Sequence, residues 1–155
     1  MKETPTLVLT AILIAALVGV HQPAPAAQLP DGRVRFETVD VYVDSGGQSL
    51  AAYQFEMAAE VGDVKIVGLE GGEHPAFRNP PYYDPAALMQ NRVIVAAFNT
   101  GRDLPRGRTR VARLHVQITG DRQPEFAIRL DAAGNAAGAR IPATIIIGRG
   151  GAGGR

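Results

Sequence analysis

Apolar and polar residues alternate through Val39–Leu69 with the period of a strand that buries one face. The apolar positions form three groups: Val39, Val41 and Val43; Tyr53, Phe55 and Met57; and Val64, Ile66, Val67 and Leu69, with a break in step before Val67. Asp44–Gly47 separates the first two groups and Val61–Asp63 the last two, and both segments carry residues that favour turns. The stretch therefore predicts three antiparallel strands.

The same pattern continues on both sides of this stretch. A first long strand is predicted over Val34–Val43, and the later strand candidates are Arg92–Phe98, Thr109–Thr119, Glu125–Leu130 and Pro142–Ile147. In Thr109–Thr119 the inward positions are Ala112, Leu114, Val116 and Ile118. About seven to nine short strands with turn signals roughly every 8–12 residues are typical of an antiparallel β-sandwich. No helix long enough for a crossover is present in the pattern, which disfavours α/β folds.

Two segments interrupt the alternation. Phe36 is out of step with Val39, so we expect a bulge or a strand switch near Glu37–Thr38. Residues 74–85 contain four prolines and cannot form continuous regular structure. We expect an extended surface loop there, carrying one short helix that Asp84 caps and Pro85 begins.

The N-terminus has the layout of a secretory signal peptide. Lys2 precedes Leu7–Val20, an uncharged run of 14 residues, and the small residues of Ala24–Ala27 follow. A membrane-spanning helix needs about 20 apolar residues, so cleavage is the first interpretation and an uncleaved anchor is the alternative. Either way we expect residues 28–148 to form one exported domain, secreted or in the cell envelope, with 149–155 as a flexible glycine-rich tail. Contact with a membrane is expected only if the anchor is retained.

Charge and cysteine content exclude several functions. The formal net charge of +1 predicts no strong attraction to nucleic acid or to anionic lipid. The chain has no cysteine, which rules out disulfides, thiolate metal sites and cysteine nucleophiles. Tryptophan is also absent, which weakens the case for a sugar-binding platform.

The sequence contains no recognisable catalytic or metal-binding motif. There is no G-x-S-x-G segment, the only serines are Ser45 and Ser49, and His21, His74 and His115 lie far apart along the chain. The acidic residues lack the spacing of a calcium loop. We therefore expect a protein that is not an enzyme and needs no metal or cofactor.

The order of these features resembles a cohesin domain, the receptor half of the cohesin–dockerin pair that assembles extracellular polysaccharide-degrading complexes. The similar segments, which span Val39 to Ile147, are VDVYVDSGGQSLAAYQFEM, VKIVGLEGG, NRVIVAAFNTGRDLPRGRTRVARLHVQITG and GNAAGARIPATI. The resemblance implies a jelly-roll sandwich with Greek-key connections, related to carbohydrate-binding modules. It also implies that a protein partner, such as a dockerin-like module, docks on a sheet face.

Four residues are candidates for contact with a partner. The resemblance points to Gln54 and Glu56, the outward positions that flank Phe55 on the strand with the core aromatic residue. Tyr82 and Tyr83 are the other two, because adjacent exposed tyrosines can stack on a sugar ring or anchor a protein. The alternatives are a solvated strand face for the first pair and a cover over the open end of the sandwich for the second.

Five arginines cluster in sequence, from the turn after Phe98 into the strand predicted over Thr109–Thr119: Arg102, Arg106, Arg108, Arg110 and Arg113. On a regular strand Arg108 and Arg110 would share a face and point away from Arg113, unless a bulge intervenes. A solvated charged turn is the interpretation we favour for this cluster.

The sequence thus predicts an exported, non-enzymatic binding module with a protein partner. Two alternatives stay open: a carbohydrate-binding module of a polysaccharide-degrading system, and a structural protein of the cell envelope.

Overall fold

The computed structural model describes residues 32–149, which form eight strands and two single turns of 3-10 helix. The strands are β1 (Val34–Asp44), β2 (Ala52–Val61), β3 (Asp63–Gly71), β4 (Tyr82–Tyr83), β5 (Arg92–Phe98), β6 (Arg108–Thr119), β7 (Glu125–Gly134) and β8 (Thr144–Arg149). The predicted leader over residues 1–27 lies outside the described residues. Arg149, assigned from the sequence to the tail, is the last residue of β8.

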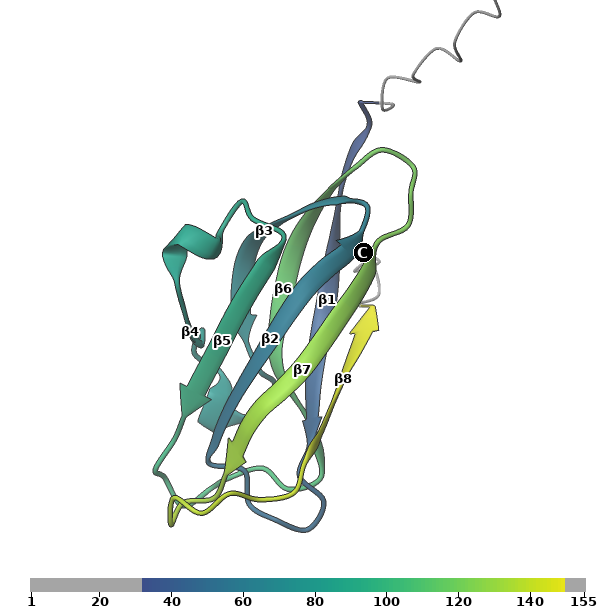
Figure 1. Ribbon diagram of the computed structural model, residues 1–155. Coiled ribbons are helices and arrows are strands. Elements are labelled where there is room, and N and C mark those ends of the chain that lie inside the picture. The colour runs from purple at the N-terminus through teal and green to yellow at the C-terminus, as the bar shows by residue number, and fades with distance from the viewer. Residues whose placement is uncertain (1–31, 150–155) are drawn as a thin grey trace, which may run out of the picture.

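Two antiparallel sheets of four strands pack face to face (Figure 1). Their orders are β3-β6-β1-β8 and β4-β5-β2-β7, and successive strands pass from one sheet to the other except between β4 and β5. This connectivity is that of a jelly roll. The predicted all-β sandwich is therefore confirmed, and its eight strands fall within the expected range.

The predicted short helix is only a single 3-10 turn. This turn, η2 (Pro85–Ala87), begins after Asp84, whose Oδ1 accepts a hydrogen bond of 2.9 Å from the backbone N–H of Ala86. A similar turn, η1 (Pro75–Phe77), begins after His74, so proline starts both turns and neither continues into an α-helix.

The core lies between the two inner faces and follows the predicted alternation. Phe55, Met57, Leu114, Val116 and Ile118 have no solvent exposure. Burial of such apolar side chains supplies most of the favourable free energy of folding, at about 25 cal/mol per Å² removed from water.

The bulge expected near Glu37–Thr38 is absent, and that prediction was wrong. β1 pairs with β6 without a shift from Val34 to Val41, and Phe36 is simply an outward residue with 69% exposure. At this open end of the sandwich the inward positions are polar instead. Arg35 forms a 2.9 Å ion pair with Glu37 and donates to the backbone carbonyl of Gly120. The apolar pattern therefore stops where the core stops.

Register shifts occur at four other places. Two lie in the pairing of β2 with β7, between Gln54 and Phe55 and between Ala59 and Val61. The third lies between Ile66 and Gly68 of β3, where the sequence has a break in step before Val67.

The fourth lies in β6, where Arg110 pairs with Tyr42 and Ala112 with Val41, so that Val111 is the extra residue. A bulged residue is left out of the pairing ladder.

A tyrosine from the opposite sheet donates a hydrogen bond to the carbonyl group of this bulged residue. Tyr53 of β2 is buried, and its hydroxyl donates a 2.9 Å hydrogen bond to the carbonyl of Val111. Burial raises the pKa of the Tyr53 phenol, so the hydroxyl remains a donor at any ordinary pH. One hydrogen bond thus ties the two sheets together through the core.

Replacing Tyr53 with Phe is expected to destabilise the fold by about 1–3 kcal/mol, because the Val111 carbonyl loses its buried partner. Urea unfolding followed by circular dichroism measures this loss. Tyr82→Phe is the control, since Tyr82 is 70% exposed, and it should change stability by less than about 0.5 kcal/mol. Equal effects of the two substitutions would contradict the role given to Tyr53.

The Gly71–Gly72 pair that ends β3 permits a close approach of backbones. A Cβ atom on Gly72 would lie 2.3 Å from the carbonyl oxygen of Arg110, far inside contact distance. Because of this clash, we expect Gly72→Ala to lower the free energy of unfolding by about 1–3 kcal/mol or more. The control is Gly47→Ala, because a Cβ on Gly47 meets nothing within 4 Å. Thermal unfolding that shifts equally for both variants would refute the packing argument.

Candidate functional site

The predicted contact residues all belong to the β4-β5-β2-β7 sheet, but only three of them reach its outer face. Gln54 and Glu56 point outward on β2, as expected, opposite the outward residues Ala96 and Ile94 of β5. Tyr82 is 70% exposed and pairs with Ala96.

Tyr83 points to the inside of the sandwich. It pairs with Val95, which is fully buried, and it packs against the core. Because successive residues of a strand face opposite sides of a sheet, the two tyrosines cannot act as one binding tip.

The neighbour of Tyr82 on the outer face is Phe98, which the sequence analysis did not select. The two rings lie nearly parallel, with centroids 6.1 Å apart and planes 11° apart, and Phe98 is 66% exposed. Its strand, RVIVAAF, is apolar on both faces, so alternation did not mark which side chains face solvent. Which residues of β5 point outward becomes clear only from the pairing of Ala96 with Gln54, an outward residue of β2.

An apolar hollow of about 330 Å³ lies beside the aromatic pair. We call it the alanine hollow, and its small lining residues are Ala52, Ala96, Ala132 and Gly134. Tyr82 and Phe98 form one wall, and Arg140 lies on the lining contributed by the β7–β8 connection. The hollow exists because three adjacent strands place small side chains in register between large ones.

The outer face of the other sheet has a different character. Its outward residues on β3 and β6 are Lys65, Glu70, Arg113, His115 and Gln117. His115 Nε2 lies 2.7 Å from Glu70 Oε1, so charged and polar partners cover the β3–β6 half of this face. On the β1–β8 half, Phe36 and Ile146 are exposed. The β4-β5-β2-β7 face differs in that its exposed aromatic rings lie beside an apolar hollow.

A ladder of ion pairs lies on the same outer face, one outward position beyond Gln54 along β2. Glu56 accepts hydrogen bonds from Arg92 Nε at 2.6 Å and from Arg129 Nη2 at 3.0 Å. Arg129 Nη1 also lies 2.6 Å from Asp131 Oδ1. The hydrogen bonds from Arg92 and Arg129 lower the pKa of Glu56 to about 2, so its carboxylate remains charged in all but strong acid.

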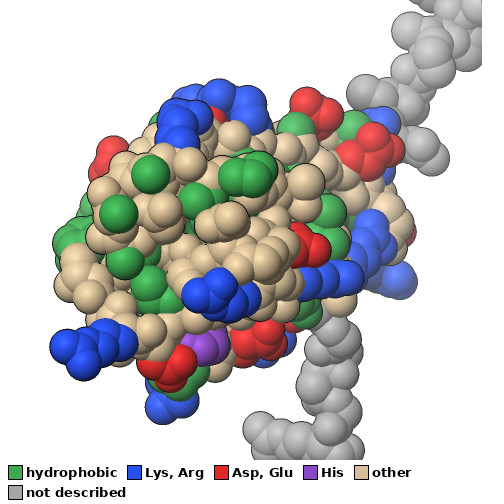
Figure 2. Space-filling view, turned by 90° about the horizontal axis from the view of Figure 1, so that it is seen from below, with side chains coloured by type: hydrophobic (Ala, Val, Ile, Leu, Met, Phe, Trp, Pro, Cys, Tyr) green, Lys and Arg blue, Asp and Glu red, His purple; other side chains and the backbone are tan. Residues whose placement is uncertain are grey.

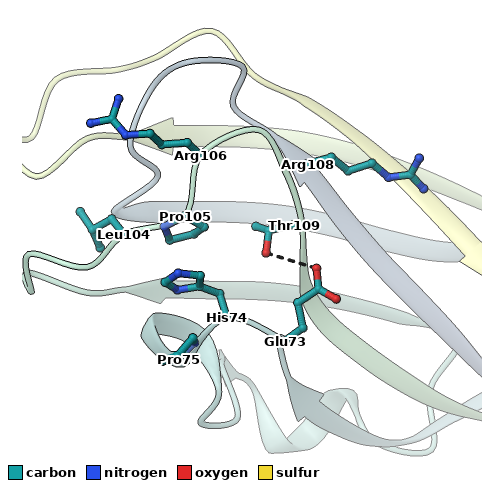
Figure 3. A pocket seen from close by; sticks show the side chains of 8 residues that line it. All are labelled: Glu73, His74, Pro75, Leu104, Pro105, Arg106, Arg108 and Thr109. Carbon is teal, nitrogen blue, oxygen red and sulfur yellow. Dashed lines mark hydrogen bonds between the residues drawn. The ribbon is translucent and has the colours of Figure 1, made fainter.

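A second hollow, of about 500 Å³, lies at the end of the sandwich where β1 and β5 finish. Viewed from that end, much of the centre is free of charged side chains, and most Lys and Arg side chains lie toward the margins (Figure 2). Glu73 and His74 point into this hollow, whereas Arg106 and Arg108 point away from each other at its rim (Figure 3).

The polar groups of this end hollow are engaged within the protein. Glu73 Oε1 accepts a 2.9 Å hydrogen bond from the backbone N–H of Arg110, and His74 Nδ1 accepts one of 3.2 Å from Ala76. Arg106 donates to the carbonyl of Gly47 at 2.6 Å, and Arg108 lies 4.6 Å above the ring centre of Tyr42. These contacts fix the loops, so the end hollow is a weaker candidate than the alanine hollow.

Residues 32–149 contain neither a candidate metal site nor a membrane-spanning helix. No group of three or more His, Cys, Asp or Glu residues is placed to hold a metal ion. No helix in the same range has the length and apolar character needed to cross a bilayer.

Comparisons with known proteins give no relative. No protein-family model, no curated protein and no protein of solved structure matches the chain.

Titration of Glu56 tests the ion-pair ladder. A carboxyl group with a lowered folded pKa stabilises the fold at pH values above its ordinary pKa of 4.5, and that contribution is lost as the pH falls through about 2. The difference in urea midpoint between wild type and Glu56→Gln should therefore shrink between these two pH values. Arg92→Gln should move the Glu56 pKa, followed by carboxyl-carbon NMR, back toward 4.5. A wild-type Glu56 that titrates at or above 4.5 would contradict the geometry.

Proposed function

We propose that residues 28–148 are an exported, non-enzymatic binding module that holds a protein partner on the outer face of the β4-β5-β2-β7 sheet. The observation that carries the proposal is the exposed Tyr82–Phe98 pair beside an apolar hollow. Aromatic residues are enriched at the centres of protein interfaces, where they contribute much of the binding free energy.

The surrounding polar residues support the same proposal. Gln54 is exposed on the lining of the hollow, and the ladder of Arg92, Glu56 and Arg129 lies beyond it on the same face. An apolar centre with a polar rim is the usual anatomy of a specific interface. The resemblance to cohesins assigns partner contacts to Gln54 and Glu56 as well, so a dockerin-like module is one partner to test.

The arrangement of the chain suits a module in an extracellular or envelope assembly. β1 begins at the end of the sandwich opposite to the end where Phe98 and Gly134 lie (Figure 1). The N-terminal attachment point therefore lies away from the alanine hollow and leaves that surface accessible.

Polysaccharide is the competing occupant, and the parallel rings of Tyr82 and Phe98 are the observation that favours it. The test is affinity electrophoresis of wild type and Tyr82→Ala in gels that contain polysaccharides. Retardation of wild type alone, with no protein partner found, would replace the protein-binding proposal with a carbohydrate-binding one.

The direct test uses the secreted and envelope proteins of the cells that make the chain. A photo-crosslinking residue at Phe98 should capture a discrete partner, whereas the same residue at Phe36 should not. Phe36 is the matched control, because it is a 69% exposed phenylalanine on the outer face of the other sheet.

The purified partner should then bind Phe98→Ala at least about tenfold more weakly than wild type, as for a central aromatic contact. Phe36→Ala should bind like wild type. Calorimetry measures both affinities. Capture from Phe36 alone, or full affinity in Phe98→Ala, would refute docking on this face.

A further inference from the structure

The alanine hollow is apolar, but it also has a positive charge beside it that no carboxylate balances. Three arginines belong to this region, and two of them, Arg92 and Arg129, are engaged by Glu56. Arg129 is also paired with Asp131. The third, Arg140, lines the hollow and is exposed.

Arg140 has no carboxylate partner within residues 32–149. Its Nη2 donates a 3.2 Å hydrogen bond to the backbone carbonyl of Asp131, which orients the guanidinium without neutralising it. Arg92 and Arg129 are thus paired with carboxylates, whereas the charge of Arg140 is not. This uncompensated charge lies on the lining of the hollow.

The size of the hollow limits what can enter it. At about 330 Å³ it is at the small end of ligand sites, enough for one or two side chains. Most of its lining is apolar, with contact surface from Ala52, Ala96 and Ala132, and Gln54, Tyr82 and Arg140 bring hydrogen-bonding side chains to its rim. The occupant is therefore an apolar group with an anionic group close beside it.

We propose that the alanine hollow is the anchor pocket for an acidic partner segment. One large apolar side chain of that segment packs between Tyr82 and Ala132, and a neighbouring aspartate or glutamate pairs with Arg140. This inference rests on the proposed protein-binding function and specifies the chemistry of the partner.

A guanidinium suits this role better than an ammonium group, because its planar fork can bind both oxygens of a carboxylate. A second copy of this chain fits less well, because two identical hollows, each with an arginine on its lining, would face one another. The proposal therefore commits to a different polypeptide with negative charge.

The probe is a random peptide library displayed on phage and selected against the exported chain. We expect enriched peptides to carry Asp or Glu within a few positions of a large apolar residue. For a synthetic peptide of that kind, replacing its acidic residue with the corresponding amide should weaken binding at least about tenfold, measured by calorimetry.

Two variants of the protein locate the binding. Arg140→Glu should weaken the peptide at least about tenfold and should select peptides with Lys or Arg in place of the acidic residue. Ala132→Leu, which fills the hollow, should also weaken it at least about tenfold. The control is Arg122→Glu, an exposed arginine in the β6–β7 connection, and it should bind within about twofold of wild type. Melting curves establish that each variant is folded.

Three results would overturn the inference: no enrichment, enriched peptides without acidic residues, or affinity unchanged in Arg140→Glu. A dimer that light scattering detects and Phe98→Ala dissociates would also overturn it, in favour of a second copy. Failure of this inference can be distinguished from failure of the proposed function. If the captured partner loses affinity for Phe98→Ala but not for Arg140→Glu, the face binds a protein and only the acidic-anchor inference is wrong.

Discussion

The bulge at Val111 in β6 is the feature on which the packing of the two sheets depends. Because it adds one residue, Arg110 and Arg113 both face outward and both reach Asp40 of β1. Arg113 binds the carboxylate through two hydrogen bonds of 2.6 and 2.9 Å, and these hold the pKa of Asp40 below its usual range. On the inner side the Val111 carbonyl accepts from Tyr53. One inserted residue thus sets an ion-pair network on one face and a link across the core on the other.

Alternation along the chain was enough to predict the sandwich, because a one-residue slip of any core strand would expose its whole apolar set. It marked the bulge of β3 as a break in step before Val67, but it could not locate the bulge of β6, since a bulge is a property of two paired strands. Phe36 suggested a bulge in β1, but the real shift lies opposite Val41 and Tyr42. The arginines held the missing signal: Arg110 and Arg113 share a face only if an extra residue separates them.

The site was predicted in part for the same reason. Gln54 and Glu56 lie on a strand with clear alternation, so their outward direction followed from the sequence. Tyr83 was placed on the wrong face, because a strand of two residues is too short for alternation to indicate which side chain points inward. Phe98 and Arg140 became visible only when strands far apart in sequence were paired, because the alanine hollow is built by β4, β5, β2, β7 and the β7–β8 connection together.

The outward alanines are informative because alanine is a poor strand former and leaves a neighbouring large side chain exposed. A sheet face in water is ordinarily covered by polar side chains, as on β3 and β6. Ala52, Ala96 and Ala132 leave instead a hollow beside two exposed aromatic rings. The edge next to β5 is only the two residues of β4, too short to template an added strand. At that edge the proposed partner therefore gains more from docking on the face, where apolar contact and the charge of Arg140 lie together, than from adding a strand.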